Sequence, residues 1–127
     1  IANVLMVCEQ PERVYFVGSE RTLYGQRLKE FATTAFATAW HADDNFTNRK
    51  GVQGVGRAQI VTDPVEIERA VILHNECYPQ FIEQITPTWI QNNAGGVHVW
   101  SIRPDFIKFW NDELYGPEGS TTFTFTE

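Results

Sequence analysis

The eight residues YFVGSERT, at positions 15–22, carry the pattern that decides the fold. β-Branched and aromatic residues from Arg13 to Val17 predict a strand. Gly18 to Thr22 then interrupts the apolar pattern, and Thr22 can act as the N-cap of a helix that continues to Phe31. The stretch therefore predicts a strand that passes, through a turn rich in hydroxyl groups, directly into a helix.

A second apolar run precedes this strand, from Asn3 to Val7. The polar residues Glu9 to Glu12 lie between the two runs, and Pro11 stands where turns favour proline, so the two runs predict a β-hairpin. The chain opens at Ile1, without methionine and within the strand pattern. We therefore expect that a leading segment precedes residue 1 and that the first strand is incomplete.

The helix expected before Phe31 has two rows of residues spaced by four. Leu23, Arg27 and Phe31 form one row, and Tyr24 and Leu28 form the other. Residues four positions apart lie on the same face of a helix. The sequence therefore predicts that these rows form a half-buried face.

The remainder of the chain alternates between strand and helix patterns. A helix is predicted over Val65–Tyr78, because Asp63 can cap its first turn, Pro64 suits its first position and Pro79 ends the pattern. The other expected elements are strands at Thr33–His41, Gly51–Thr62, Val97–Ile102, Phe106–Trp110 and Thr121–Thr126, a turn at Arg103–Asp105, a helical turn at Phe81–Ile85, and loops at Ala42–Lys50 and Asn92–Gly96. This order predicts one domain over residues 1–127, a mainly antiparallel β-barrel with a few helices.

Glycines at positions 51, 54 and 56 lie within one expected strand. Glycine inside a strand indicates a bulge or a place where another group approaches the backbone closely. These glycines do not open a helix and no Gly-Lys-Ser/Thr sequence follows them, so they do not form a nucleotide-binding loop.

The composition excludes several classes of function. A formal net charge of -6 argues against a broad surface for nucleic acid or anionic membranes, and 43% hydrophobic residues favour a packed core. No apolar run approaches the roughly 20 residues that a membrane-spanning helix needs. Cys8 and Cys77 lie far apart and fit no disulfide framework, which favours a reducing compartment. We expect a cytoplasmic protein with no nucleic-acid or membrane partner.

No catalytic or metal-binding set emerges from the residue spacing. His74 and Cys77 lie one helical turn apart, a spacing that suits a soft metal, but no second pair completes a tetrahedral site. A partly buried polar residue and a small hydrophobic residue are the simpler interpretation. No Ser/His/Asp or Cys/His arrangement has supporting spacing. No metal is predicted, and the catalytic residues stay unknown.

Three segments together resemble the pyridoxamine-phosphate-oxidase-like family and its group of predicted flavin-nucleotide-binding proteins. They are residues 15–22 followed by Gln26-Arg27-Leu28, residues 51–58 followed by Asp63-Pro64, and the run WSIRPDFIKFW at 100–110. Each segment alone is weak evidence, whereas their order along the chain is more specific. The resemblance implies a flavin-reductase-like antiparallel split β-barrel, in which 100–110 would form a hairpin.

The resemblance also implies a homodimer that binds flavin mononucleotide (FMN) at the subunit interface. The phosphate would lie at the strand-to-helix turn, where helix-start N–H groups, hydroxyls and a guanidinium can bind a dianion. The residues that this assigns to the phosphate are Gly18, Ser19, Arg21, Thr22 and Tyr24, with help from Arg27 or Lys50. Those near the flavin ring would be Asn3, Leu5, Gln53 and Trp110.

Structural roles for the same residues stay open. Ser19, Arg21 and Thr22 can form a capped helix start with a solvated arginine. Tyr24 and Trp110 can be packing residues, and Gln53 can bond to backbone or water. Asn3 and Leu5 can be ordinary residues of the first strand.

The chain departs from the better-known oxidases of this family. Leu23 and Tyr24 stand where those oxidases carry a basic phosphate ligand, Ala2 and Val7 replace basic residues, and the C-terminal substrate-binding segment is not found. We therefore expect a flavin-dependent oxidoreductase with an unknown small-molecule substrate rather than a pyridoxamine-phosphate oxidase.

Two alternatives stay open. In the first, the split barrel has lost flavin and serves as a dimeric ligand-binding or interaction module. In the second, it binds a deazaflavin or heme, and heme would need His41, His74 or His98 as its axial ligand.

Overall fold

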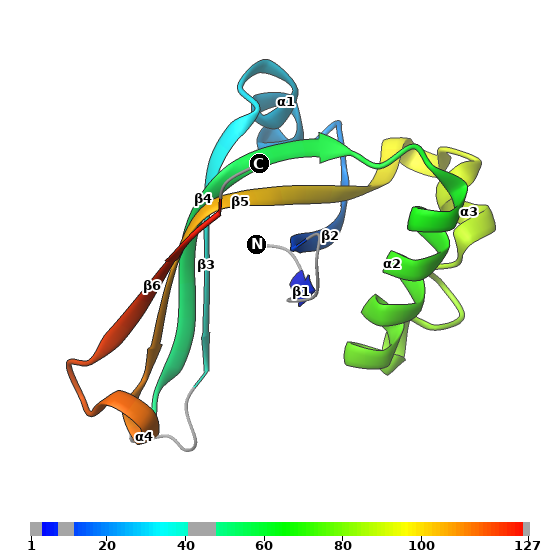
Figure 1. Ribbon diagram of the computed structural model, residues 1–127. Coiled ribbons are helices and arrows are strands. Elements are labelled where there is room, and N and C mark those ends of the chain that lie inside the picture. Colours follow the sequence, from blue (N-terminus) through cyan, green and yellow to red (C-terminus); the bar gives the residue numbers. More distant parts are fainter. Residues whose placement is uncertain (1–3, 8–11, 41–47, 126–127) are drawn as a thin grey trace. The chain divides into compact units, whose positions relative to one another are not determined.

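The computed structural model describes residues 4–7, 12–40 and 48–125 (Figure 1). Its elements in chain order are β1 Val4–Val7, β2 Arg13–Ser19, α1 Leu23–Glu30, β3 Thr33–Trp40, β4 Lys50–Ile60, α2 Pro64–Cys77, the 3₁₀ helix η1 Pro79–Phe81, α3 Pro87–Gln91, the 3₁₀ turn η2 Ala94–Gly96, β5 Val97–Asn111, α4 Asp112–Tyr115 and β6 Ser120–Thr124. No helix in the described ranges is long and apolar enough to cross a membrane.

The strands form a six-stranded sheet in the order β1-β2-β5-β4-β3, and β6 pairs with β5. The pairs β1–β2, β2–β5 and β5–β6 are antiparallel, with Tyr15 opposite Leu5 on one side and Ser101 on the other. The predicted fold class, a mainly antiparallel β structure with a few helices, is confirmed.

The chain divides into two compact units. Unit 1 comprises 1–32 and 57–103, and unit 2 comprises 33–56 and 104–127. β4 and β5 contribute residues to both units, because each boundary falls inside a strand.

The core of unit 1 lies between the sheet and the helices α2 and α3. Asp63 caps α2 by accepting a hydrogen bond from the Glu66 N–H, and Pro64 occupies its first turn, as the sequence predicts. The fully packed members of this core are Tyr15, Val61, Ile67, Ala70, Val71, Ile85, Ile90 and Val99.

A second set of contacts in unit 1 joins β2, β5 and α1 around one tryptophan. The Trp100 ring is 1% exposed and stacks on Phe16, with ring centroids 5.9 Å apart and planes 4° apart. Its indole N–H donates to the Gly18 carbonyl at 3.0 Å. Tyr24 of α1 lies over Gly18 so closely that a Cβ at that position would overlap the phenol hydroxyl.

Another group approaches the backbone closely at Gly51 and Gly54, as the sequence predicts. A Cβ at Gly51 would overlap the Trp110 indole, and a Cβ at Gly54 would overlap the Phe36 ring. Close packing of these rings on the backbone therefore explains why the two strand positions lack a side chain.

The turn into α4 is held by Asn111, whose side-chain oxygen accepts from two N–H groups of that helix.

One expected pair of strands is wrong. Val97–Ile102 and Phe106–Trp110 are not joined by a turn at Arg103–Asp105 but form the single strand β5. Along β5, the pairing with β2 stops at Ile102 and the pairing with β6 starts at Phe106. Pro104 lies between these two positions and belongs to neither the β2 ladder nor the β6 ladder.

Other expectations need smaller corrections. Leu23 and Phe31 are 73% and 59% exposed, so that row of α1 is not half-buried, whereas Tyr24 and Leu28 are partly buried. Lys50 opens β4 rather than ending a loop, and the rest of the expected loop through residue 47 lies outside the described residues. The short helices α3 and α4 were not expected, because single-turn helices have little periodicity to detect.

Titration of Tyr15 provides a test of the unit 1 core. Its hydroxyl donates to Glu66 Oε1 at 2.9 Å, and burial together with this carboxylate raises the pKa of Tyr15 to about 12. Because the folded pKa lies above the ordinary value of about 10, the resulting stability is present below pH 10 and is lost as the pH rises through 12. Tyr15→Phe should lower the free energy of unfolding by about 1 kcal/mol at neutral pH and remove that alkaline loss. Denaturant unfolding from pH 8 to 12 measures both effects, with the exposed Tyr115→Phe as control; equal alkaline losses in wild type and Tyr15→Phe would contradict the assignment.

Substitution of Gly18 tests the packing of α1 on β2. Gly18→Ala should lower the free energy of unfolding by about 1 to 3 kcal/mol, because the new methyl group overlaps the Tyr24 phenol. In a Tyr24→Phe background the same substitution should cost less, since the overlapping oxygen is gone. Chemical denaturation of the four proteins of this double-mutant cycle provides the measurement. An undiminished cost of Gly18→Ala in the Tyr24→Phe background would show that the Tyr24 hydroxyl does not limit this position.

Candidate functional site

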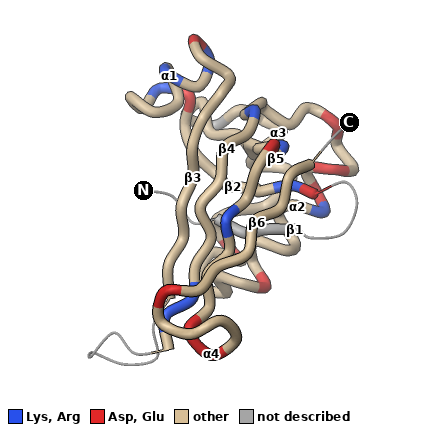
Figure 2. The backbone as a smooth tube through the Cα atoms, turned by 60° about the vertical axis from the view of Figure 1, so that its left-hand side comes forward, with Lys and Arg blue, Asp and Glu red and all other residues tan. Residues whose placement is uncertain are grey.

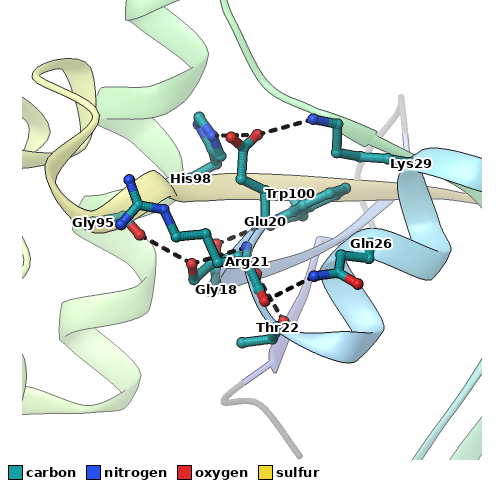
Figure 3. Close-up of polar contacts among 10 residues, drawn as sticks. Gly18, Glu20, Arg21, Thr22, Gln26, Lys29, Gly95, His98 and Trp100 are labelled. Carbon is teal, nitrogen blue, oxygen red and sulfur yellow. Dashed lines mark hydrogen bonds and ion pairs between the residues drawn. The ribbon is translucent and has the colours of Figure 1, made fainter.

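The turn between β2 and α1 is built by its own hydroxyl groups. The Ser19 hydroxyl donates to the Gly95 carbonyl at 3.0 Å and accepts from the Arg21 N–H at 3.1 Å. The Glu20 N–H donates to the Gly96 carbonyl at 3.0 Å. These bonds fasten the turn to the loop that carries η2. Figure 3 shows the contact at Gly95.

Thr22 is the N-cap of α1, as predicted. Its hydroxyl donates to the Ser19 carbonyl at 2.7 Å and accepts from the Gly25 N–H at 3.1 Å. A hydroxyl has one proton, so the protons of Ser19 and Thr22 are both engaged within the protein. The serine and threonine side chains thus have structural roles at this turn.

Arg21 differs from its neighbours in the turn. Its side chain is exposed, and its guanidinium makes no hydrogen bond or ion pair with any residue that the structure describes. The N–H groups of Leu23 and Tyr24, in the first turn of α1, also lack an acceptor among the described residues, whereas the next N–H groups are bound by Thr22. One cation and two free backbone donors therefore lie at the same helix start.

Glu20 forms the charged edge of this site. Its carboxylate oxygen Oε2 lies 3.4 Å from Lys29 Nζ and 3.2 Å from His98 Nε2 (Figure 3). Hydrogen bonding and charge from Lys29, with a further contribution from His98, lower the pKa of the Glu20 carboxyl below its usual value. Figure 2 shows both signs of charge on α1 and the turn before it.

Five residues at this site were not predicted from the sequence: Glu20, Lys29, His98 and the two glycines of η2, Gly95 and Gly96. Gly95 and Gly96 have φ angles of +68° and +71°, a conformation that favours glycine. These two adjacent glycines indicated a loop in the sequence. The contact of this loop with a turn 76 residues earlier depends on the sheet register. The signal in the sequence was local and the contact is not.

Lys50, Gln53 and Trp110, which the sequence assigned to the flavin site, belong to unit 2. Lys50 Nζ lies 3.1 Å from Glu113 Oε2 and 5.2 Å from the Trp40 ring centroid. Gln53 lines an open groove of about 440 Å³ with residues that include Phe36, Phe106 and Lys108. Trp110 packs on Gly51.

Of the remaining candidates, the structure describes Leu5 and Arg27. Leu5 lies in β1 and pairs with Tyr15 of β2, and Asn3 lies outside the described residues. Arg27, the alternative helper at the phosphate, is paired with Glu30 at 3.1 Å on the exposed face of α1.

The histidines differ in their access to a ligand. His74 is 2% exposed, with Nδ1 on Asn75 and its ring against Tyr78 and Phe81. His41 is outside the described residues, and the His98 side chain is 14% exposed beside Glu20. Within the described ranges, no group of three or more His, Cys, Asp or Glu residues could hold a metal ion.

The structure of this chain is similar to several solved structures. A heme-binding protein from Mycobacterium smegmatis matches with a TM-score of 0.66 at 15% identity, over 88% of this chain and 42% of that chain. A pyridoxamine 5′-phosphate oxidase-related, FMN-binding protein from Nostoc punctiforme matches with a TM-score of 0.51 at 9% identity, over 98% and 78%. A protein of the pyridoxinephosphate oxidase family from Clostridium acetobutylicum matches with a TM-score of 0.50 at 17% identity, over 88% and 66%.

The relationship is visible in the fold and not in close sequence similarity. No protein-family model matches the sequence, and no protein with a curated description matches it. The chain spans less than half of the heme-binding protein and about two thirds of the clostridial protein. FMN-binding and heme-binding proteins are both among its structural neighbours. The chain has the split β-barrel fold of the pyridoxamine-phosphate-oxidase-like proteins.

Proposed function

We propose that this protein binds FMN and serves as a flavin-dependent oxidoreductase of the pyridoxamine-phosphate-oxidase-like type. The observation that carries the proposal is the guanidinium of Arg21, unpaired among the described residues, beside the free N–H groups of Leu23 and Tyr24. A phosphate group needs charge-assisted donors of this kind, and a helix start supplies them together with a favourable dipole. Arg21 and these two N–H groups would hold the flavin phosphate.

Fewer side chains are available to donate to the phosphate than the sequence suggested. Ser19 and Thr22 would shape the site without donating to the phosphate, since each already donates its hydroxyl proton to a backbone carbonyl. Tyr24 would support the site by packing on Gly18. A single cation would hold the anion in this arrangement, because the other nearby cation, Lys29, is paired with Glu20.

Flavin, when bound, would supply the electron or hydride transfer, and the protein would supply phosphate capture and a pocket for the ring. Asn3, Leu5, Lys50, Gln53 and Trp110 stay predictions for the remainder of the flavin site. A homodimer with shared sites, a small-molecule substrate and a cytoplasmic location are likewise proposals, which rest on the resemblance and on the composition.

Two specific observations favour the alternative functions, an interaction module and heme binding. The hydroxyl protons of Ser19 and Thr22 are both donated to backbone carbonyls, which suits a split-barrel interaction module as well as a flavoprotein. A structural neighbour is a heme-binding protein. For heme, His98 would be the ligand among the described histidines, because His74 is enclosed by aromatic rings. The absorbance spectrum of the purified protein separates a flavin band, a Soret band and neither.

Replacement of Arg21 tests the phosphate assignment. Arg21→Gln should weaken FMN binding by about 1.5 to 3 kcal/mol, or about ten- to hundredfold, because a charge-assisted hydrogen bond to the phosphate is lost. Titration of FMN fluorescence measures Kd. The matched control is Arg69→Gln, which removes the same charge from the exposed surface of α2.

Riboflavin, which lacks the phosphate, should bind equally to the wild type and to Arg21→Gln. Equal FMN affinities of the wild type and Arg21→Gln would remove Arg21 from the site. A wild-type protein that binds no FMN would refute the cofactor assignment itself.

A further inference from the structure

The Glu20 carboxylate connects three separate parts of unit 1. It pairs with Lys29 from the last turn of α1 and with His98 from the start of β5, while its own backbone N–H is bound to Gly96. The His98 ring is mostly buried and meets the Trp100 ring edge-on at 6.5 Å. The imidazole is therefore held in position on one side by an aromatic ring and on the other by a carboxylate.

This cluster lies next to the proposed anion site. A Cβ placed on Gly96 would come within 3.2 Å of Glu20 Cγ and 3.3 Å of Arg21 Nε, so the two side chains flank the same glycine. In Figure 3, Arg21 extends over Gly95 while Glu20 extends between Lys29 and His98. The charge on the cluster is therefore close enough to act on an anion that Arg21 holds.

We propose that Glu20, Lys29 and His98 form a proton-linked charge cluster that couples anion binding at Arg21 to proton uptake by His98. This inference rests on the proposed FMN site and adds to it a dependence on pH. With His98 neutral, Glu20 and Lys29 cancel and Arg21 leaves one net positive charge. With His98 protonated, the same four side chains carry two.

The sign of the coupling follows from this charge count. Histidine gains its charge in the range of about pH 5 to 8, so the site becomes more positive as the pH falls through that range. A more positive site binds the flavin phosphate more tightly. By reciprocity, a bound anion favours protonation of His98, so binding takes up protons. The described groups that contact Glu20 are Lys29 from α1 and His98 from β5, and Arg21 flanks it from the turn.

Calorimetric titration of the protein with FMN tests the coupling directly. Titrations from about pH 5 to about pH 8, each in two phosphate-free buffers of different protonation enthalpy, give both Kd and the number of protons taken up. The flavin phosphate titrates near pH 6 as well, so proton uptake is compared at about pH 7 and above, where the free phosphate is already mostly dianionic. Wild type should take up more protons than His98→Gln.

The affinities should follow the same pattern. The ratio of Kd in His98→Gln to Kd in wild type should rise from about 1 at pH 8 to about two- to fivefold at pH 5, the effect of one additional charge that water and salt partly screen. Lys29→Gln is the matched control, because it removes a permanent charge and should weaken binding by a similar factor at every pH.

Glu20→Gln gives an independent test in which the imidazole stays in place. Removal of the carboxylate should tighten FMN binding throughout the pH range and move proton uptake to lower pH, because the group that favours protonated His98 is lost. Wild type and His98→Gln that bind FMN with equal proton uptake and a constant ratio of Kd values would overturn this inference alone. A wild type that binds no FMN at any pH would overturn both this inference and the proposed function.

Discussion

The hydrogen bond from the Trp100 indole to the Gly18 carbonyl is the contact on which the candidate site depends. It is buried, and the same indole is stacked on Phe16, so it fixes where β2 ends relative to β5. An unpaired indole N–H or carbonyl at this depth would cost about 1 to 3 kcal/mol. The turn from Ser19 to the start of α1 follows directly, and the bonds of Ser19 and Glu20 to Gly95 and Gly96 hold it further.

The polar side chains of the turn are of two kinds: those that bond to other parts of the protein, and one that has no such partner in the described structure. Ser19 and Thr22 use their hydroxyls to hold the backbone, and Glu20 uses its carboxylate to hold Lys29 and His98. Arg21 is the residue of the turn whose charge has no such partner in the described structure. The same local geometry is the reason why Arg21 is proposed as the ligand-binding side chain, whereas its neighbours form the framework around it.

Exposure determines how strongly these charges can act. Lys29 and Glu20 are partly exposed, and ion pairs of this kind contribute little to folding stability because water and salt screen them. Their importance lies in the potential that they create at the helix start, where a bound phosphate would be only partly screened. His98 is the more buried partner, so its charge would be felt more strongly than that of Lys29.

The sequence by itself determined the local elements: a strand from Arg13 that gives way to a turn, the Thr22 cap, the Asp63-Pro64 helix start and the close approach to Gly51 and Gly54. These depend on neighbouring residues and on backbone preferences, which the chain displays directly. Only the tertiary structure decided that β5 runs through Pro104, that the hydroxyl protons of Ser19 and Thr22 are already used, and that His98 meets Glu20. Each of these, apart from the local Thr22 bond, depends on sheet register between residues far apart in the chain, and one residue of slip would turn every side chain to the opposite face.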